Sequence, residues 1–249
     1  MFPLIQFGSI TIPTYYLAIS IGTITGITWF LKRAHHEDEG TAINLCFVGL
    51  VCGFIGARLL HIFYEMPGPY LANPSLIPQF WYGGFVYFGG LIAGVGAAAI
   101  YAKFKHYQVY EWLDRVSLPL GAAYAIGRLG CFLNGCCYGR ICDLPWAVSF
   151  PAHSTWGMTL EPRHPTQLYA AVLEAVAIFI LAQAQKLKLF KNPGSLFFVW
   201  LAWHAINRIL MELFRDDDRG AALAGLSVST CISFILLLGS IISLLRKRA

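Results

Sequence analysis

Long apolar runs alternate with short polar connections along the chain, and this pattern predicts seven membrane-spanning helices. Each run has about the ~20 residues that an α-helix needs to cross the hydrocarbon core of a bilayer. The runs are Thr14–Leu31, Ala42–Tyr64, Gly84–Ala102, Val116–Leu133, Gln167–Gln185, Gly194–Phe214 and Ala221–Leu245. No Lys or Arg precedes the first run, and it lacks a clear small-x-small cleavage site. We therefore expect it to stay as a helix rather than to be removed as a signal peptide.

The composition agrees with a membrane protein and excludes a soluble domain. Hydrophobic residues make up 57% of the 249 residues and charged residues only 12%, against about 25% charged residues in soluble domains. The sequence therefore predicts an all-α integral membrane protein formed as one domain over residues 1–249. The longest non-spanning piece, residues 134–166, is expected to form a small cap outside the membrane. The stretch "FGSITIP" near the N-terminus suggests a short strand or an interfacial arm.

The positive charges are distributed asymmetrically over the connections, and they predict the orientation. One side of the predicted membrane domain collects Lys32, Arg33, Lys103, Lys105, Arg115, Lys186, Lys188, Lys191, Arg246, Lys247 and Arg248. The other side has only Arg140, Arg163, Arg215 and Arg219. Because cytoplasmic loops of membrane proteins carry the excess of Lys and Arg, we expect the N-terminus outside and the C-terminus in the cytoplasm.

Ionisable residues also lie inside the predicted spans, where they are costly and usually face a partner or a cavity. The sixth span places His204, Arg208, Glu212 and Arg215 at spacings of four, four and three, which gives one polar stripe on an apolar helix. The other ionisable residues in or at the ends of the spans are Arg58, His61, Glu65, Arg128 and Glu174.

Two interpretations of these charges remain open. Internal pairs such as Arg208 with Glu212, or Arg58 with Glu65, would lock helices together. Alternatively, the excess of buried arginines indicates an anionic ligand such as a lipid phosphate, which the planar guanidinium group binds with two hydrogen bonds.

The segment at the start of the third span is rich in glycine, with Gly83, Gly84, Gly89, Gly90, Gly94 and Gly96 in "YGGFVYFGGLIAGVGAAA". Such small residues either let two helices approach closely or let a phosphate or lipid chain approach the backbone.

Several motifs resemble one known family. "GRLGCFLNGCCYGR" at residues 127–140 resembles the signature of bacterial prolipoprotein diacylglyceryl transferases, roughly G-R-[IL]-G-N-F-[IL]-N-G-E-x-[WY]-G-R. Further agreement comes from "RHPTQLYAA", "NRILMELFRDDD", "FGGLIAG", "GARLLHIFYE" and "IPTYYLAIS", all in the family's order. The resemblance covers nearly the whole chain, and the combined pattern is highly specific.

The resemblance implies seven spanning helices with the N-terminus outside, in the bacterial inner membrane, and an active site toward the extracytoplasmic side. It implies transfer of the diacylglyceryl group of phosphatidylglycerol to the lipobox cysteine in the signal peptide of a prolipoprotein, with glycerol phosphate released. It implies no metal, no organic cofactor and no nucleic-acid partner.

The resemblance also implies which residues form the site. Arg128 and Arg208 would stabilise the charge of the leaving phosphate, and Glu212 would orient Arg208 or handle the proton. The residues implied to bind substrate are Arg58, Asn134, Gly139, Arg140, His164, Gly89, Gly90 and Tyr15, with Tyr16 as the alternative to Tyr15.

The sequence departs from the family pattern at three polar positions. Phe88 replaces the histidine of the family's H-G-G block, Cys131 replaces an asparagine and Cys136 replaces a glutamate. The general base is therefore open, with His61, His164, His204 and Glu212 as candidates. Besides the family reaction, we consider a diverged paralogue that transfers lipid to another acceptor, and a lipid-binding or transport protein without catalysis.

The cysteines allow several interpretations. Cys131, Cys136, Cys137 and Cys142 cluster on the predicted outer side and would form disulfides, act as redox or acyl-accepting thiols, or bind a metal with His153 or His164. A thiol–disulfide enzyme that uses Cys136 and Cys137 is a further hypothesis, weakened by the absence of a C-x-x-C motif. Cys46, Cys52 and Cys231 lie in spans and are expected to be small apolar packing residues.

Overall fold

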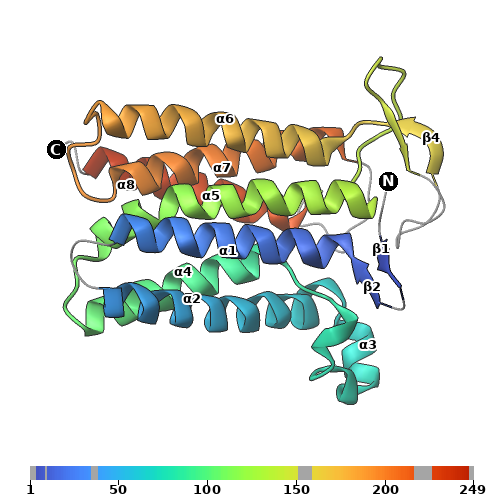
Figure 1. Ribbon diagram of the computed structural model, residues 1–249, viewed down its shortest axis with the longest axis horizontal. Coiled ribbons are helices and arrows are strands. Elements are labelled where there is room, and N and C mark those ends of the chain that lie inside the picture. Colours follow the sequence, from blue (N-terminus) through green and yellow to red (C-terminus); the bar gives the residue numbers. More distant parts are fainter. Residues whose placement is uncertain (1–3, 9, 35–38, 151–158, 216–225, 247–249) are drawn as a thin grey trace. The chain divides into compact units, whose positions relative to one another are not determined.

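The computed structural model describes residues 4–8, 10–34, 39–150, 159–215 and 226–246, and within these residues it is dominated by long helices (Figure 1). Among the described residues, seven helices are long and apolar enough to cross a membrane. They are α1 (Thr14–Ala34), α2 (Glu39–Leu60), α4 (Tyr87–Phe104), α5 (Val109–Asn134), α6 (Thr166–Lys186), α7 (Ser195–Phe214) and α8 (Val228–Arg246). The predicted all-α membrane class with seven spans is therefore confirmed.

The contacts divide the chain into two compact units. Unit 1 comprises Met1–Phe30, Asp114–Asp218 and Ser233–Ala249, and unit 2 comprises Leu31–Leu113 and Arg219–Ile232. The expectation of a single membrane domain stays a prediction.

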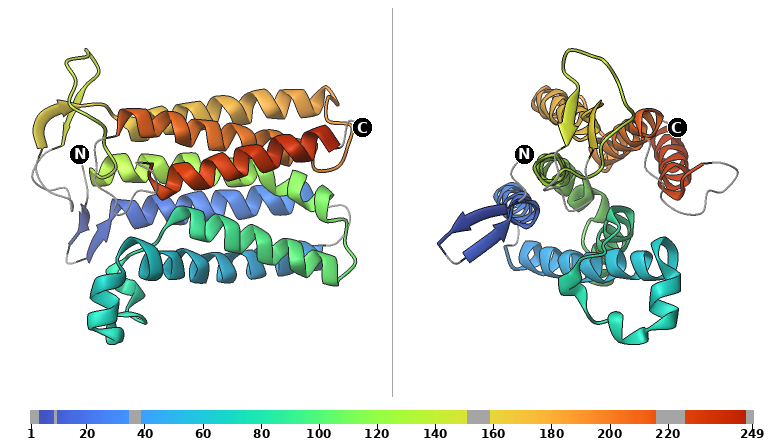
Figure 2. Two further views of the ribbon diagram at one scale, coloured as in Figure 1. Left: turned by 180° about the vertical axis from the view of Figure 1, so that it is seen from behind. Right: turned by 90° about the vertical axis from the view of Figure 1, so that its right-hand side faces the viewer.

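Unit 1 is built around α5, α6 and α7, which lie side by side in Figures 1 and 2. Its fully buried apolar side chains include Trp200, Leu118 and Leu196. Asp114 joins two of these helices, because its two carboxylate oxygens accept hydrogen bonds from the backbone N–H groups of Gly194 (2.6 Å) and Phe197 (2.8 Å) at the start of α7. An acidic side chain at a helix N-terminus satisfies N–H groups that have no partner within the helix. Asp114 lies in the polar first turns of α5, before the apolar run that was predicted to begin at Val116. These turns therefore help to attach α5 to α7.

The described part of unit 1 also contains two small antiparallel sheets. Strands β1 (Leu4–Phe7) and β2 (Ile10–Pro13) form a hairpin with Leu4 opposite Pro13, which confirms the short strand predicted in "FGSITIP". Strands β3 (Val148–Phe150) and β4 (Thr159–Arg163) pair within the segment predicted to form a cap. Residues 151–158 of that segment, with His153, lie outside the described residues, as do Arg219, Lys247 and Arg248 from the charge pattern.

Unit 2 is centred on the pair α2 and α4, shown side by side in both views of Figure 2. Glycines line the contact: a Cβ atom added to Gly89 would lie 2.4 Å from the carbonyl oxygen of Gly56, and one added to Gly56 would lie 2.6 Å from that of Gly89. The two backbones therefore touch directly, which is the close helix approach that small residues permit.

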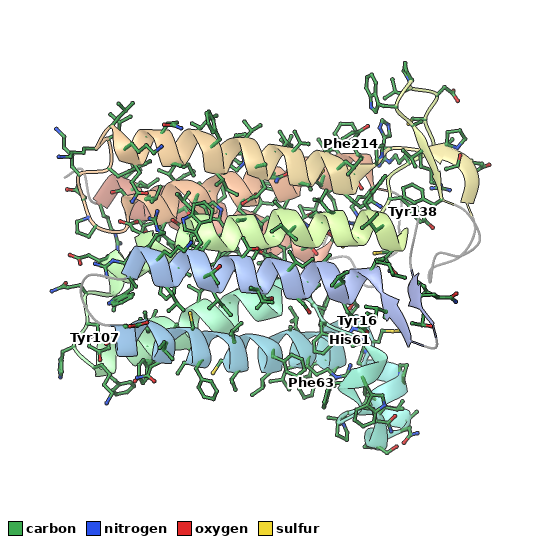
Figure 3. All side chains as sticks on the ribbon, in the orientation of Figure 1. Tyr16, His61, Phe63, Tyr107, Tyr138 and Phe214 are labelled. Carbon is green, nitrogen blue, oxygen red and sulfur yellow. The ribbon has the colours of Figure 1, made fainter. Side chains whose placement is uncertain are left out.

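The α2–α4 connection of unit 2 is made of short helical pieces. They are a π-helical turn η1 (His61–Glu65), α3 (Pro67–Ala72) and the 3₁₀ turns η2 (Pro74–Leu76) and η3 (Phe80–Tyr82). Figure 3 places His61 and Phe63 at this end of the unit and Tyr107 at the opposite end.

Large apolar side chains are exposed along the helices of both units. Phe47 in α2 is 67% exposed, Phe179 in α6 is 65% exposed and Ile235 in α8 is 70% exposed. Exposed apolar surface on this scale is unfavourable in water and is the normal surface of a helix that faces lipid.

Candidate active site

An arginine–glutamate pair near the end of α7 is the centre of the candidate site. Arg208 Nη1 lies 2.8 Å from Glu212 Oε2, one helical turn away. The Arg208 side chain is 5% exposed and that of Glu212 is 25% exposed. The internal pair that one of the two interpretations considered is therefore present, and Glu212 compensates the charge of the buried Arg208.

The second arginine, Arg128, lies on α5. Its guanidinium carbon lies over the ring of Tyr124, 4.8 Å from the ring centroid. A cation in this position over an aromatic face gains a cation–π interaction. Arg128 and Arg208 are thus held by different partners within unit 1.

A buried polar network continues from Tyr124 into the middle of the helices. The rings of Tyr124 and His204 meet edge to face at a centroid distance of 4.6 Å. His204 Nδ1 lies 3.2 Å from Glu174 Oε2, and Trp200 donates its indole N–H to Glu174 Oε1 over 2.8 Å. Asn207 also donates to Glu174 Oε2, over 3.3 Å. Glu174 is fully buried, so these three donors compensate its desolvation.

The sequence stripe on the sixth span thus has two parts with different partners. His204 belongs to the buried network of Glu174, whereas Arg208 and Glu212 pair with each other one turn later. Asn207, Trp200 and Tyr124 were missed by the sequence reasoning. The stripe "WHAINR" contains the signal for Asn207, because it lies three residues from His204 on the same face.

The loop after α5 is tied to the ends of two other helices. Thr166 Oγ1 donates to the carbonyl oxygen of Cys137 (2.7 Å), and Gln167 Nε2 donates to that of Cys136 (2.6 Å), both from the first turn of α6. Gly139 forms an isolated bridge with Arg215, just after α7. The motif at residues 127–140, the block at 163–171 and the end of α7 therefore meet within unit 1. Thr166 and Gln167 were not predicted to be site residues, although both lie in "RHPTQLYAA".

Gly139 occupies a position with no room for a side chain. A Cβ atom there would lie 2.6 Å from the carbonyl oxygen of Phe214, 2.7 Å from His164 Cβ and 2.8 Å from Thr166 Cγ2. Its backbone N–H donates to His164 O over 2.9 Å. Figure 3 shows Phe214 and Tyr138 in this part of unit 1, beside the strand β4.

Arg140 and His164 flank this glycine. The backbone N–H of Arg140 donates to Phe214 O (2.7 Å), and its side-chain Nε donates to Arg215 O (3.2 Å), while the guanidinium group is exposed. His164 is partly buried and its Nδ1 lies 3.2 Å from the hydroxyl of Tyr169. That hydroxyl also accepts the indole N–H of Trp146 over 2.7 Å.

Asn134 and Tyr15 lie at the ends of their helices. Asn134 is the last residue of α5 and is 8% exposed. Tyr15 is in the first turn of α1, which packs closely on α5: a Cβ atom added to Gly130 would lie 2.6 Å from Ala18 Cβ. Tyr15 interacts electrostatically with Arg128 and with the thiols of Cys131, Cys136 and Cys137.

Three cysteines gather where α5 ends. The Sγ atoms of Cys131, Cys136 and Cys137 all lie within 4.8 Å of one another. The Cys136 thiol donates to Cys131 O over 3.6 Å. All seven cysteines of the chain are free thiols in the structure, and Cys142 does not belong to the group of three. His153, one of the further ligands considered from the sequence, lies outside the described residues.

The thiols of Cys136 and Cys137, which lie beyond the end of the α5 span, titrate differently. Hydrogen bonds from the Cys131 and Cys136 thiols lower the pKa of Cys137 well below its ordinary value, against the opposite effect of burial. The positive charges of Arg215 and Arg128 lower it further. The pKa of Cys136 is raised, because its thiol is hydrogen-bonded to Cys131 and Cys137 and is buried.

The remaining predicted residues belong to unit 2. Arg58 is 8% exposed and points into a ring of backbone carbonyls. It donates to the carbonyl oxygens of Gly83, Gly84, Leu76, Ile77 and Gln79. The internal pair of Arg58 with Glu65, which one of the two interpretations of the sequence considered, is not formed. Glu65 instead accepts from His61 Nδ1 at 2.6 Å, because the π-helical turn and the folded-back connection give Arg58 closer acceptors.

A cavity of about 240 Å³ lies beside Arg58, lined also by Met66, Pro69, Tyr70, Leu76 and Gln79. Gly89 and Gly90 face α2 in the close helix contact, and Phe88 is buried at 3% exposure. A substrate contact of Arg58, Gly89 or Gly90 stays a prediction.

Comparisons with known proteins agree with the motifs. The family model for prolipoprotein diacylglyceryl transferase matches residues 3–246. A phosphatidylglycerol–prolipoprotein diacylglyceryl transferase of Clostridium tetani is 32% identical over 84% of this chain and 81% of its own length. Proteins of the same name from Rhodospirillum rubrum and Polynucleobacter asymbioticus are 31% and 35% identical, over 99% and 78% of this chain and 92% and 74% of their own lengths.

Proposed function

The chain belongs to the prolipoprotein diacylglyceryl transferase family, and from this premise we propose that it transfers the diacylglyceryl group of phosphatidylglycerol to the lipobox cysteine of a prolipoprotein. The observation that carries the proposal is the pair Arg208–Glu212 at 2.8 Å, held in the same unit as Arg128 and the loop around Gly139.

The reaction replaces a C–O bond by a C–S bond. The acceptor thiol loses its proton, and its sulfur attacks the glycerol carbon that carries the phosphate. The C–O bond to the phosphate breaks, and its electron pair leaves with the oxygen of glycerol phosphate. The phosphate changes from a diester with one negative charge to a monoester that gains a second, so the leaving group becomes more negative in the transition state.

Arginines suit this charge change. Groups that are preorganised toward developing charge stabilise the transition state more than the ground state. Arg128 is fixed on the ring of Tyr124 and Arg208 is fixed by Glu212, so neither side chain needs to reorganise. We assign both to the phosphate of phosphatidylglycerol, and Glu212 to the orientation of Arg208.

The loop supplies the remaining contacts. Gly139, Asn134 and Arg140 belong to the segment that α6 and the end of α7 hold in place. We assign these residues to the glycerol headgroup, together with Tyr15 on α1. Arg58, Gly89 and Gly90 are assigned to the lipid on the strength of the family motifs.

The proton acceptor differs from the family histidine, which Phe88 replaces. His204 is committed to Glu174 in the buried network, and His61 to Glu65 in unit 2. His164 is partly buried, lies beside the Gly139 loop and has Tyr169 at its Nδ1. We therefore assign the proton to His164, with Glu212 as the alternative acceptor.

A second candidate function is lipid binding, or transfer to a different acceptor. It is favoured by the loss of three polar family residues at Phe88, Cys131 and Cys136. Under this alternative the arginines still bind phosphatidylglycerol, but a lipobox thiol gains no diacylglyceryl group.

We further propose that the chain lies in the bacterial inner membrane, with its N-terminus and the Gly139 loop on the extracytoplasmic side. The support is the distribution of Lys and Arg between the two sides of the predicted spans. An alkaline phosphatase fused after residue 249 should be inactive, whereas green fluorescent protein fused there should fluoresce. Active phosphatase at this position would reverse the orientation.

The function is tested by mass spectrometry of a lipobox peptide incubated with purified protein and phosphatidylglycerol. The peptide should gain one diacylglyceryl group. The variant Arg208→Ala should lose this transfer, while Lys186→Ala, an exposed cation at the far end of α6, should retain it. Binding of phosphatidylglycerol without any transfer by the unmodified protein would favour the second candidate.

A further inference from the structure

The three-cysteine cluster of Cys131, Cys136 and Cys137 has no role in the proposed transfer. Its geometry is suited to binding a metal ion. The three Sγ atoms lie within 4.8 Å of one another at the end of α5. Cys136 is buried, and Cys131 and Cys137 are partly buried. Three sulfur atoms this close are within reach of a single ion that bonds sulfur at about 2.3 Å.

The backbone is bent in a way that brings these thiols together. Gly135 and Cys137 both have left-handed backbone conformations, with φ of 73° and 65°. A non-glycine residue in that region is strained and persists where surrounding contacts enforce it. Here Thr166 and Gln167 enforce it by binding the carbonyl oxygens of Cys137 and Cys136. The chain is thereby turned back so that Cys136 and Cys137 meet Cys131.

A second observation is the buried amide of Gln167. Gln167 is 1% exposed, and its Nε2 donates to Cys136 O. Among the described residues its Oε1 has no hydrogen-bond partner. An unpaired buried oxygen is costly, and this one belongs to the side chain that holds the cluster in place.

We propose that Cys131, Cys136 and Cys137 bind one Cu(I) ion. Soft thiolate ligands select Cu(I) or Zn²⁺ over harder cations. Protein zinc sites almost always have four ligands, whereas Cu(I) is satisfied by three sulfurs in a plane. The group of neighbouring ligands that the described residues form contains three thiols and no fourth member, so Cu(I) is the better match.

Positive charges near the cluster can compensate the charge of such a complex. Each thiol that becomes a ligand releases one proton, so three thiolates and one Cu(I) carry a net charge of −2. Two arginines, Arg128 and Arg215, interact electrostatically with Cys137. Their positive charges offset that of the complex in a poorly hydrated site, where an uncompensated charge would be costly.

The test uses the full-length protein in detergent, reduced, freed of reductant and kept without oxygen. Cu(I) is titrated in competition with a coloured Cu(I) chelator, and X-ray absorption then reports the ligands. We expect one equivalent of Cu(I) per chain, with three sulfur neighbours. Failure of the protein to take Cu(I) from the chelator, or ligation by fewer than three sulfurs, would overturn the proposal.

Single variants assign the ligands. Cys131→Ser, Cys136→Ser and Cys137→Ser should each lower the affinity for Cu(I) at least roughly tenfold. The matched control is Cys142→Ser, a nearby thiol outside the cluster, which should bind Cu(I) as the unmodified protein does. Equal binding by the triple Ser variant, or an equal loss in Cys142→Ser, would contradict the assignment. Elution as a single species in size-exclusion chromatography checks that each variant is folded.

Two further measurements separate the competing uses of these thiols. A parallel titration with Zn²⁺ should show weaker retention than Cu(I), and preferential retention of zinc would overturn the assignment to Cu(I). Alkylation of the denatured, unreduced protein followed by mass measurement should find all three thiols reactive. A disulfide within the cluster would overturn the proposed Cu(I) site, because thiols joined in a disulfide cannot serve as thiolate ligands. None of these readouts depends on diacylglyceryl transfer, so the two proposals succeed or fail independently.

Discussion

Arg208 and Glu212 are joined by a 2.8 Å hydrogen-bonded ion pair across one turn of α7, and they differ fivefold in side-chain exposure, 5% against 25%. Taking a buried guanidinium group out of water is costly unless a counter-charge stays close. Glu212 is that counter-charge, and it is also the more accessible member. A phosphate that approaches Arg208 therefore meets a cation whose position is already set.

Charge, rather than hydrogen bonding alone, is the first feature to test at this pair. Glu212→Gln keeps a side chain of the same shape that accepts from Arg208, but it removes the carboxylate charge. We expect transfer to a lipobox peptide to fall by about 10²-fold or more. Without the Glu212 charge, Arg208 would be less well oriented toward the phosphate and would stabilise the transition state less. Arg208→Lys should lose a similar factor, since an ammonium group cannot donate in the planar, two-pronged way of guanidinium.

Both variants should still bind detergent and elute as the unmodified protein does. Glu161→Gln, which changes an exposed glutamate of β4 that pairs loosely with Arg163 at 3.6 Å, is the control and should keep full activity. Full activity of Glu212→Gln would remove Glu212 from the site.

The loop around Gly139 gives a steric prediction. Gly139→Ala adds a methyl group where the carbonyl oxygen of Phe214 would lie at 2.6 Å. The loop must shift away from α6 and α7, so we expect transfer to fall at least tenfold with little loss of membrane insertion, because small displacements of positioning groups cost large factors in rate. Gly68→Ala, where an added Cβ meets nothing within 4 Å, is the matched control.

The Gly139 prediction is checked with the peptide transfer assay on both glycine variants. Equal activities of the two would show that the loop tolerates the shift and that the close approach has no bearing on catalysis.

The sequence predicted most of this fold because spanning helices have a simple signal. A run of about 20 apolar residues is sufficient to identify a helix in a bilayer, and all seven runs correspond to helices. The site was predictable where sequence spacing alone brings two residues together. Arg208 and Glu212 are an example, since residues four apart lie on one helix face.

Other contacts could not be predicted, because they form where the chain folds back on itself and the local sequence does not show where it does so. Arg58 and Glu65 looked like partners by spacing, yet the π-helical turn η1 gives Glu65 to His61, and the connection folds its carbonyls around Arg58. The roles of Gln167 and Thr166 arise because α6 starts beside the loop that follows α5. Such contacts join residues about thirty positions apart, so they become visible only in three dimensions.

The buried carboxylate Glu174 yields a stability prediction. In the unmodified protein, Glu174 Oε2 lies within hydrogen-bond distance of Asn207 Nδ2 and His204 Nδ1. Glu174→Gln replaces one carboxylate oxygen by an amide NH₂ group, which cannot accept a hydrogen bond from these two side chains. Donors left without an acceptor in a buried site cost about 1–3 kcal/mol. We expect the midpoint of thermal unfolding in detergent to fall by several degrees, at about 2–4 °C per kcal/mol for a chain of this size.

The same measurement on Glu161→Gln serves as the control, because exposed substitutions usually stay within about 0.5 kcal/mol. An unchanged midpoint for Glu174→Gln would show that the hydrogen bonds to the carboxylate contribute little to stability.

The glycine contact between α2 and α4 provides the last prediction. Gly89→Ala would place Cβ 2.4 Å from Gly56 O and 2.7 Å from Leu60 Cβ, so the two helices must separate. Overpacking of this kind costs roughly 1–3 kcal/mol. On the same helix, a Cβ atom added to Gly96 meets nothing within 4 Å, and alanine favours a helix over glycine by about 1 kcal/mol. Thermal unfolding should therefore occur at a lower temperature in Gly89→Ala and at an equal or higher temperature in Gly96→Ala. If both variants were stabilised, the glycines would not be needed for packing, and their presence in α4 would instead point to the lipid contact that the family motif implies.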